Sequence, residues 1–333
     1  MERKSLWVVL GFFFFILIGG MFPFKMASAE QFEINWVSFI PQQDPVVDGV
    51  LRGFVNRVTQ NSKGEIVFKY RGGPETIPGP DQVKAVQKGV VDMSVNLVGF
   101  VEPLAPGVGG AMLTQISLDE ERKSGGGYDF LNELYKKAGL FYLGRSNPSD
   151  EFFYLALNKK IEKPQDFVGK RIGTAPAARA CTEAWGATPV TLNLPEYYSA
   201  MERGLVDGIS SCSLSTWVAL GCYEVTKYIV EPGYYQATGT VFMNLDKWNR
   251  LPKHLQTVMI ESIIQSEKDN QSWTLETNKK AREKIVKAGV NFYKLSPEGT
   301  KWFIETAYNA AWDYQQKRFP EVTPKLRGFL SKK

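Results

Sequence analysis

Apolar and polar residues alternate in several short segments of the chain, and helical spacing of apolar residues fills the intervals between them. Residues 32–39 alternate with a period of two, which predicts a strand, and a helical pattern begins at about Pro45. Further strands are predicted at 66–70 and 92–97, with a second helix between them. This β-α-β-α-β succession is typical of a mostly parallel sheet with helices on its faces.

The second half of the chain shows the same alternation, which predicts a second lobe. Residues 152–157 are expected to lead from the first lobe into the second, and residues 241–244 to cross back. Two crossovers of this kind make a hinge. Between them we expect strands at 170–174, 190–192 and 206–210, and helices at 177–185, 195–203 and 214–225.

One segment occurs twice, 115 positions apart. Ala85–Asp92 and Ala200–Asp207 both read Ala, two variable residues, a cation, Gly, an apolar residue, Val and Asp. The cation suits the negative end of a helix and the Gly suits the left-handed position after it. Each copy therefore predicts a helix, a turn and a strand, and the pair predicts two lobes of similar build. We interpret Asp92 and Asp207 as turn residues rather than as a catalytic pair.

A long helical pattern follows the second crossover, at residues 252–288. At 1.5 Å per residue it would span on the order of 50 Å, so it should either brace both lobes or break once. We divide the chain into a first lobe of residues 30–152 and 241–290, which includes this helix, and a second lobe of residues 153–240 and 291–333, which includes a terminal helix.

The first 29 residues have the pattern of a secretory signal peptide. Arg3 and Lys4 form a basic start, residues 6–24 are apolar, and small residues at 27–29 suit cleavage. A retained membrane anchor is the alternative, because the apolar run approaches the length of a span. Interruptions in the run favour cleavage. We therefore expect a mature protein that is soluble outside the cytoplasm, in the periplasm.

Composition and charge exclude several function classes. The content of 44% hydrophobic and 23% charged residues is ordinary for a globular protein, and the net charge of +5 includes no basic stripe that would bind nucleic acid. Cys181, Cys212 and Cys222 lack metal-type spacing, and the single His254 could not complete a metal site. One disulfide with one thiol left over is compatible with export, and any pair could form it. With no nucleophile and base at recognisable spacing, we expect neither a catalytic residue nor a cofactor.

Several segments resemble a known family. Residues 166–172, 186–190 and 196–208, and then 227–235 and 251–256, are similar to the DctP-type periplasmic solute receptors of tripartite ATP-independent periplasmic (TRAP) transporters. The resemblance covers nearly the whole mature chain. It implies an α/β, two-lobed periplasmic-binding-protein fold of type II-like build, with an interlobe cleft and a long bracing helix. It also implies delivery of a solute to TRAP membrane subunits. We expect the receptor to be a monomer.

The sequence departs from this family at the arginine that typically clamps a solute carboxylate. Aligned without gaps from Asp166, the family's arginine position falls on Gly173. Counted back from Gly186, it falls on Arg171. The two positions are two residues apart and share a strand face, so Arg171 could reach the same pocket.

Other polar positions of the family also differ here. Its sialic-acid branch has an Asn where Ser211 stands and an arginine near Phe153, and its keto-acid branch has carboxylates where Ser210 and Gln236 stand. A hard cation needs anionic oxygens, so the substitutions argue against a metal-assisted site.

The predicted cleft is aromatic and neutral-polar, which favours an organic acid with an aromatic or bulky apolar part. A neutral or amine solute is the alternative, since aromatic walls also accept cations. Trp217 and Tyr235 could equally be core residues, and Arg171 a surface cation. The candidate cleft residues are Phe39, Asn96, Phe153, Gly173, Ser210, Ser211, Trp217, Tyr235 and Gln236, with Arg145, Arg171 and Arg179 as candidate anion partners.

Three function classes fit these features. The sequence favours a solute receptor that closes two lobes around its ligand and serves a TRAP transporter. A secreted enzyme of the same shape is the second class, and turnover of a bound compound would reveal it. A ligand-binding sensor for a membrane signalling partner is the third, and a gene for a paired transport subunit beside this one would argue against it.

Overall fold

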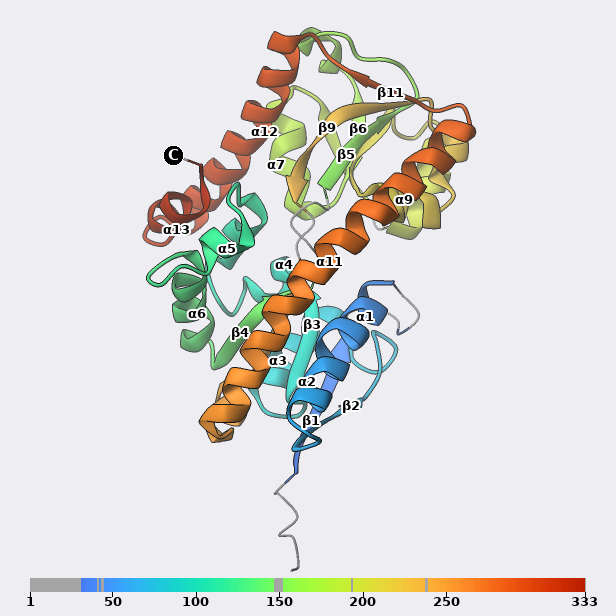
Figure 1. Ribbon diagram of the computed structural model, residues 1–333. Helices are drawn as coiled ribbons and strands as arrows, with labels where there is room; N and C mark the ends of the chain where they lie inside the picture. Colours follow the sequence, from blue (N-terminus) through green and yellow to red (C-terminus); the bar gives the residue numbers. More distant parts are fainter. Residues whose placement is uncertain are drawn as a thin grey trace, which may run out of the picture.

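The computed structural model describes residues 31–40, 42, 45–146, 152–192, 194–236 and 239–332. The proposed signal segment lies outside these residues. Figure 1 shows two lobes, one above the other, with one long helix running across both. The predicted two-lobed α/β fold is confirmed. None of the helices in the described ranges combines the length and the apolar character that a membrane span needs.

The first lobe is built on a five-stranded sheet in the order β2-β1-β3-β10-β4. Strand β1 is parallel to β2 and β3, and β10 is antiparallel to β3 and β4. Its strands are β1 (Phe32–Ser38), β2 (Ile66–Tyr70), β3 (Met93–Leu97), β4 (Leu140–Arg145) and β10 (Gly239–Asn244). Its helices are α1 (Pro45–Val50), α2 (Asn56–Asn61), α3 (Gly79–Gln87), α4 (Val98–Val101), α5 (Leu118–Glu121), α6 (Gly127–Lys137) and α10 (Leu245–Arg250), with a 3-10 segment at Val108–Leu113.

The second lobe is built on a six-stranded sheet in the order β11-β9-β5-β8-β6-β7. Strands β6, β7 and β8 are parallel, whereas β5 is antiparallel to both of its neighbours. Its strands are β5 (Phe152–Leu157), β6 (Arg171–Thr174), β7 (Thr188–Thr191), β8 (Gly208–Cys212), β9 (Tyr228–Gln236) and β11 (Asn291–Lys294). Its helices are α7 (Arg179–Ala184), α8 (Tyr197–Glu202) and α9 (Leu214–Ala219).

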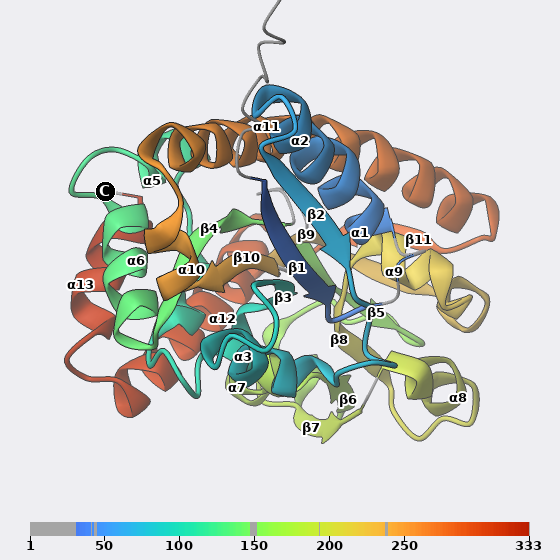
Figure 2. The same ribbon diagram turned by 90° about the horizontal axis from the view of Figure 1, so that it is seen from below.

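Helix α11 (Lys253–Lys287) is continuous over 35 residues and crosses both lobes, as Figures 1 and 2 show from two directions. Near its start, Leu255 and Met259 belong to the core on one face of the first sheet. Near its end, Ala281 and Ile285 belong to the core on one face of the second sheet. Of the two alternatives for this helix, bracing both lobes is therefore correct.

The terminal helices also connect the lobes. Helix α12 (Pro297–Arg318) packs against α7 and β9 of the second lobe, whereas α13 (Thr323–Leu330) packs against α6 and the 3-10 segment of the first. Phe303 and Leu326 consequently belong to one apolar core that spans both sheets. The sequence analysis placed residues 291–333 in the second lobe with one terminal helix. The structure has a further helix, α13, in this range, and its contacts outside α12 lie with the first lobe.

The two copies of the repeated segment have the same structure. Gly89 and Gly204 have φ values of 71° and 65°, the left-handed conformation that ends a helix at glycine. Each following aspartate then pairs with the backbone of a neighbouring strand. The Asp92 carboxylate accepts from the Asn35 N–H at 2.8 Å, and the Asp207 carboxylate accepts from the Arg171 N–H at 2.8 Å. Both aspartates are turn residues, as predicted.

Candidate functional site

The carboxyl ends of the parallel strands in the two sheets face each other across the crossovers. Gly239, which starts β10 after the second crossover, pairs with Leu97 at the end of β3. Tyr154, near the start of β5 after the first crossover, pairs with Cys212 at the end of β8. Each carboxyl edge therefore lies at the crossover end of its lobe. In open α/β sheets this edge is where ligands bind.

On the first lobe, Asn96 and Phe39 form part of this edge. Asn96 is fully buried, and its Nδ2 donates to the Gly79 carbonyl at 2.9 Å while its Oδ1 accepts from the Leu97 N–H at 2.8 Å. Phe39 is half-buried, with its Cβ 3.4 Å from the point where a Cβ on Gly79 would lie. Asn96 thus shapes the edge, and Phe39 is the more accessible of the two.

On the second lobe, Ser210 and Ser211 hold the edge together. The Ser210 hydroxyl lies 2.9 Å from the Thr182 hydroxyl. The Ser211 Oγ accepts from the Ala175 N–H at 2.7 Å and lies 2.8 Å from the Tyr197 hydroxyl. These contacts connect the ends of β6 and β8 to the helices behind them. Both serines therefore have structural partners at the predicted edge.

Arg171 lies at the opposite end of β6. Its side chain is exposed, and its Nη2 donates to the Gly204 carbonyl at 2.7 Å, at the turn before β8. This position corrects the expectation that Arg171, two residues before Gly173 on the strand, reaches the pocket. Sharing a face with Gly173 is not sufficient, because the strand's amino end points away from the crossovers.

The arginine that the family typically carries at the position of Gly173 would have to displace the ends of two apolar side chains. A Cβ added there would lie 2.4 Å from Ile209 Cδ1 and 2.8 Å from Leu192 Cδ1. Real Cβ atoms do not approach other carbon atoms so closely. Ile209 of β8 and Leu192, which follows β7, fill the space beside Gly173 with apolar side chains, so this position is part of the core.

Arg179 is a half-exposed cation at the carboxyl edge of the second sheet. It begins α7, five residues after the end of β6. Its Nε lies 3.0 Å from Glu183, its Nη1 donates to the Thr191 hydroxyl at 3.4 Å, and its side chain is 50% exposed. Thr191 is the last residue of β7, another carboxyl end. The sequence signal for Arg179 is its place near the start of the predicted helix 177–185, which follows the predicted strand 170–174.

The predicted aromatic residues occupy different surroundings. Trp217 is 2% exposed in the core behind the second sheet, and its Nε1 donates to the Thr226 hydroxyl at 3.1 Å. Of the two alternatives for Trp217, the core position is correct. The rings of Tyr235 and Phe153 stack at 5.8 Å between centroids, and the Tyr235 hydroxyl lies 3.9 Å from Met112 of the first lobe. Burial raises the pKa of Tyr235, so its hydroxyl remains protonated.

Phe152 and Gln236, which lie next to the stacked pair on strands β5 and β9, face a cavity. Phe153 pairs with Tyr235 and Phe152 pairs with Gln236 in the register of β5 and β9. Since neighbouring side chains point to opposite faces of a strand, Phe152 and Gln236 point away from the stacked rings. They line a cavity of about 590 Å³ whose other walls are residues 114–120, Lys268, Gln271 and Lys332. Of the predicted site residues, Gln236 alone is among those that line it.

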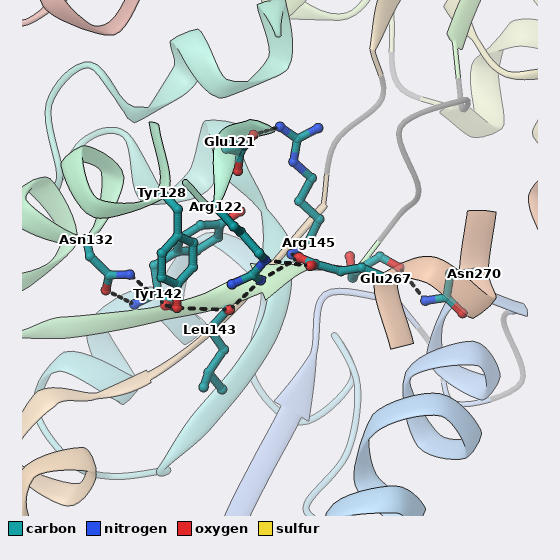
Figure 3. A network of polar contacts seen from close by, with 10 residues as sticks. Glu121, Arg122, Tyr128, Asn132, Tyr142, Leu143, Arg145, Glu267 and Asn270 are labelled. Atoms are coloured by element: carbon teal, nitrogen blue, oxygen red, sulfur yellow. Dashed lines mark hydrogen bonds and ion pairs between the residues drawn. The ribbon is translucent and has the colours of Figure 1, made fainter. Parts of the chain in front are cut away.

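Arg145 lies behind Gln236 in a buried charge cluster, shown in Figure 3. Its guanidinium pairs with Glu121 and also donates to Gln236 Oε1 at 3.3 Å. Arg122 holds both Glu267 oxygens at 2.9 Å, and Glu267 also accepts from the Arg145 N–H at 2.8 Å. Burial raises the pKa of Glu267, although the charge of Arg122 opposes this shift. No local pattern marks the cluster, because α5, β4 and α11 are far apart in sequence.

All three cysteines are buried thiols. Burial raises the pKa of Cys181 to about 12 and that of Cys222 to about 11. None of the three possible disulfides between these cysteines is present in the structure. Within the described ranges, no group of three or more His, Cys, Asp and Glu side chains has an arrangement that could hold a metal ion.

Comparisons with known proteins agree with this architecture. A family model described as "Bacterial extracellular solute-binding protein, family 7" matches residues 37–318. A monocarboxylate 2-oxoacid-binding periplasmic protein from Nostoc sp. is 22% identical over 219 residues, which are 63% of this chain and 59% of the relative. The chain thus spans less than two thirds of that relative's length.

Two solved structures have the same fold. A TRAP periplasmic solute-binding protein from Ochrobactrum anthropi has a TM-score of 0.78 at 23% identity, covering 91% of this chain and 95% of that one. Another from Desulfovibrio salexigens, with bound orotic acid, has a TM-score of 0.75 at 22% identity, covering 90% and 97%.

Proposed function

The chain belongs to family 7 of the bacterial extracellular solute-binding proteins, whose members are receptors for small solutes, and on this premise we propose that it closes its two lobes around an organic acid. The observation that carries the proposal is that the carboxyl edges of the two sheets face each other across two crossovers. The edges can approach each other by rotation about the crossovers. Helix α11 packs on both lobes and keeps them connected.

The anion partner in this proposal is Arg179 and not Arg171. Arg179 lies at a carboxyl edge, and its pair with Glu183 is half-exposed and one helical turn apart. Such a pair is worth little, so a solute carboxylate can replace Glu183 at low cost. The planar guanidinium then offers two parallel donors to two carboxylate oxygens.

The apolar part of the solute would lie against Phe39, which is half-buried at the edge of the first lobe. Asn96 and Ser211, with their structural partners, keep the neutral-polar rim in place. An aromatic or bulky organic acid fits this combination. The 2-oxoacid and orotic acid named for two of the similar proteins are both acids, which supports the class without identifying the solute. A neutral or amine solute is the second candidate.

We further propose that the receptor delivers its solute to TRAP membrane subunits as a monomer in the periplasm, after cleavage of residues 1–29. The support is the membership of the family and the fold that it shares with TRAP solute-binding proteins. A sensor that docks a membrane signalling partner would use the same facing edges.

The test is native mass spectrometry of the protein purified from its own host, followed by titration calorimetry with the compound that is released. The expected result is one organic acid bound with one-to-one stoichiometry and recovered unchanged. Recovery of an amine or a sugar would replace the solute class, and conversion of the compound during incubation would indicate an enzyme. The absence of saturable binding by any released compound would overturn the proposal.

A further inference from the structure

Helix α12 packs on the second lobe with its first half. The Trp185 Nε1 donates to the Phe303 carbonyl at 2.9 Å, and the two rings stack with 4.4 Å between their centroids. The Cys181 thiol donates to the Ala307 carbonyl at 3.4 Å. Cys181 belongs to α7, which begins at Arg179, and Trp185 follows α7 directly. The first half of α12 is therefore joined by hydrogen bonds to the helix that carries the proposed anion partner.

The second half of α12 packs on the first lobe, where the 3-10 segment Val108–Leu113 presents glycines to it. A Cβ added to Gly109 would lie 2.7 Å from Gln315 Nε2, and one added to Gly110 would lie 3.0 Å from Trp312 Cζ3. Without side chains, these glycines form an even surface under the helix. Packed helices slide over one another in shear motions, and an even surface permits such sliding.

This second contact leaves three buried polar atoms unpaired. Trp312 Nε1, Gln315 Oε1 and Glu102 Oε1 have no hydrogen-bond partner among the described residues, although none of the three residues is more than 7% exposed. Buried polar atoms in folded proteins are nearly always paired, because an unpaired atom loses its hydration without compensation. The contact of α12 with the first lobe is therefore less well satisfied than its contact with the second.

One ion pair holds the contact of α12 with the first lobe. The Arg318 Nη1 donates to Glu102 Oε2 at 2.6 Å, and the Arg318 guanidinium lies 4.8 Å from the centroid of the Phe319 ring. Arg318 is the last residue of α12. Glu102 follows α4, which starts directly after the carboxyl end of β3. The pair therefore connects α12 to the candidate edge of the first lobe.

The two facing edges are accessible to solvent in the described arrangement. The Arg179 side chain is 50% exposed on the second lobe, and Phe39 is half-buried on the first. A receptor closed around its solute covers the groups that contact the solute. The described arrangement is therefore the open one.

On the basis of the proposed receptor function, we propose that α12 moves with the second lobe and slides on the first when the lobes close. Glu102 and Arg318 are positioning residues, because their ion pair favours the open arrangement. The closed arrangement supplies partners for the polar atoms that are unpaired in the open one. The ion pair and the unpaired atoms thus have opposite effects on the equilibrium between the two arrangements, and this equilibrium sets the apparent affinity for the solute.

Titration calorimetry with the released solute tests this proposal. Arg318→Met removes the ion pair, so we expect the solute to bind about three-fold more tightly. Gln315→Met removes an atom that is paired only in the closed arrangement, so we expect binding to be weaker by about three-fold. Because Gln315 Oε1 has no partner in the open arrangement, this variant should unfold at a temperature no lower than the parent protein. Arg318→Lys retains the charge and should bind as the parent protein does.

Lys301→Met is the matched control, because Lys301 pairs with Glu305 at 3.9 Å on the exposed side of the first half of α12. Its solute affinity should equal that of the parent protein. Small-angle X-ray scattering without solute is the second measurement, and Arg318→Met should have a smaller radius of gyration than the parent protein because more molecules are closed.

An unchanged affinity in Arg318→Met or in Gln315→Met, shifts of both variants in the same direction, or an equal shift in Lys301→Met would overturn the proposal. A parent protein that binds no released solute would instead overturn the receptor function. In that case the scattering comparison decides alone, and equal radii of gyration for Arg318→Met and the parent protein would overturn the movement of α12.

Discussion

Asp207 and Arg171 form a reciprocal backbone pair: the Asp207 carboxylate accepts the Arg171 N–H at 2.8 Å, and the Asp207 N–H donates to the Arg171 carbonyl at 2.7 Å. Asp92 makes the same two contacts with Asn35 in the first lobe. Arg171 of β6 is thus the counterpart of Asn35 of β1 in the first lobe. Its side chain belongs to the turn of the repeated segment and not to the facing edges.

Arg179→Ala should weaken binding of the released solute by about 2 kcal/mol, because it removes a charge-assisted pair. Arg171→Ala is the matched control, since it deletes the same charge on the same lobe at the far end of β6. Its affinity should equal that of the parent protein in titration calorimetry. If Arg171→Ala is the weaker binder of the two, the assignment of the anion partner is wrong.

Gly173→Ala should destabilise the protein by about 1–3 kcal/mol, because the added Cβ would lie 2.4 Å from Ile209 Cδ1. Urea unfolding measures the loss. The variant Ile209→Val lacks that Cδ1 atom. Gly173→Ala should therefore cost less stability in the Ile209→Val background than in the parent protein. An equal loss of unfolding free energy from Gly173→Ala in both backgrounds would show that the contact with Ile209 Cδ1 does not cause the destabilisation.

Arg122→Ala should lower the free energy of unfolding by about 3–5 kcal/mol, since it leaves the buried Glu267 carboxylate without its bidentate partner. Lys280→Ala is the control, because Lys280 and Glu276 form an exposed pair whose loss should cost at most about 0.5 kcal/mol. Equal losses in the two variants, measured by urea unfolding, would contradict a structural role for the buried cluster.

Asp166 should contribute to the acid dependence of stability. The Glu162 and Lys163 backbone N–H groups hold the Asp166 carboxylate and lower its pKa below the usual 3.8. A carboxyl group with a lowered native pKa stabilises the fold above its unfolded pKa, and this contribution disappears as the pH falls through the native value. Urea midpoints between about pH 2 and pH 6 should therefore fall less steeply in Asp166→Asn than in the parent protein. If the urea midpoint changed with pH equally in Asp166→Asn and in the parent protein, Asp166 would not be responsible for the loss of stability at low pH.

The three cysteines should be unreactive toward a disulfide reagent in the native protein at neutral pH. Cys181 and Cys222, with pKa values raised by burial to about 12 and about 11, hold almost no thiolate. Unfolding in denaturant without reductant should release three thiols. Release of a single thiol would show that a disulfide forms in the exported protein.

The sequence by itself determined the features that depend on neighbours along the chain. Alternating residues predicted the strands, and the repeated cation-Gly pattern predicted two similar lobes, because strand faces and helix ends are set within a few residues. The long helix was also evident from its apolar spacing. The motifs shared with a known receptor family indicate the family from the sequence alone.

Only the tertiary structure decided which side chains meet. Arg171 and Arg179 both flank β6, but only the strand's direction distinguishes the residue at the turn from the one at the facing edge. The pairing of Arg122 with Glu267 joins residues 145 positions apart. Likewise, Phe153 and Gln236 point to opposite faces because of the strand register. The physical reason is that side-chain partners are chosen by packing between distant segments, which no local pattern encodes.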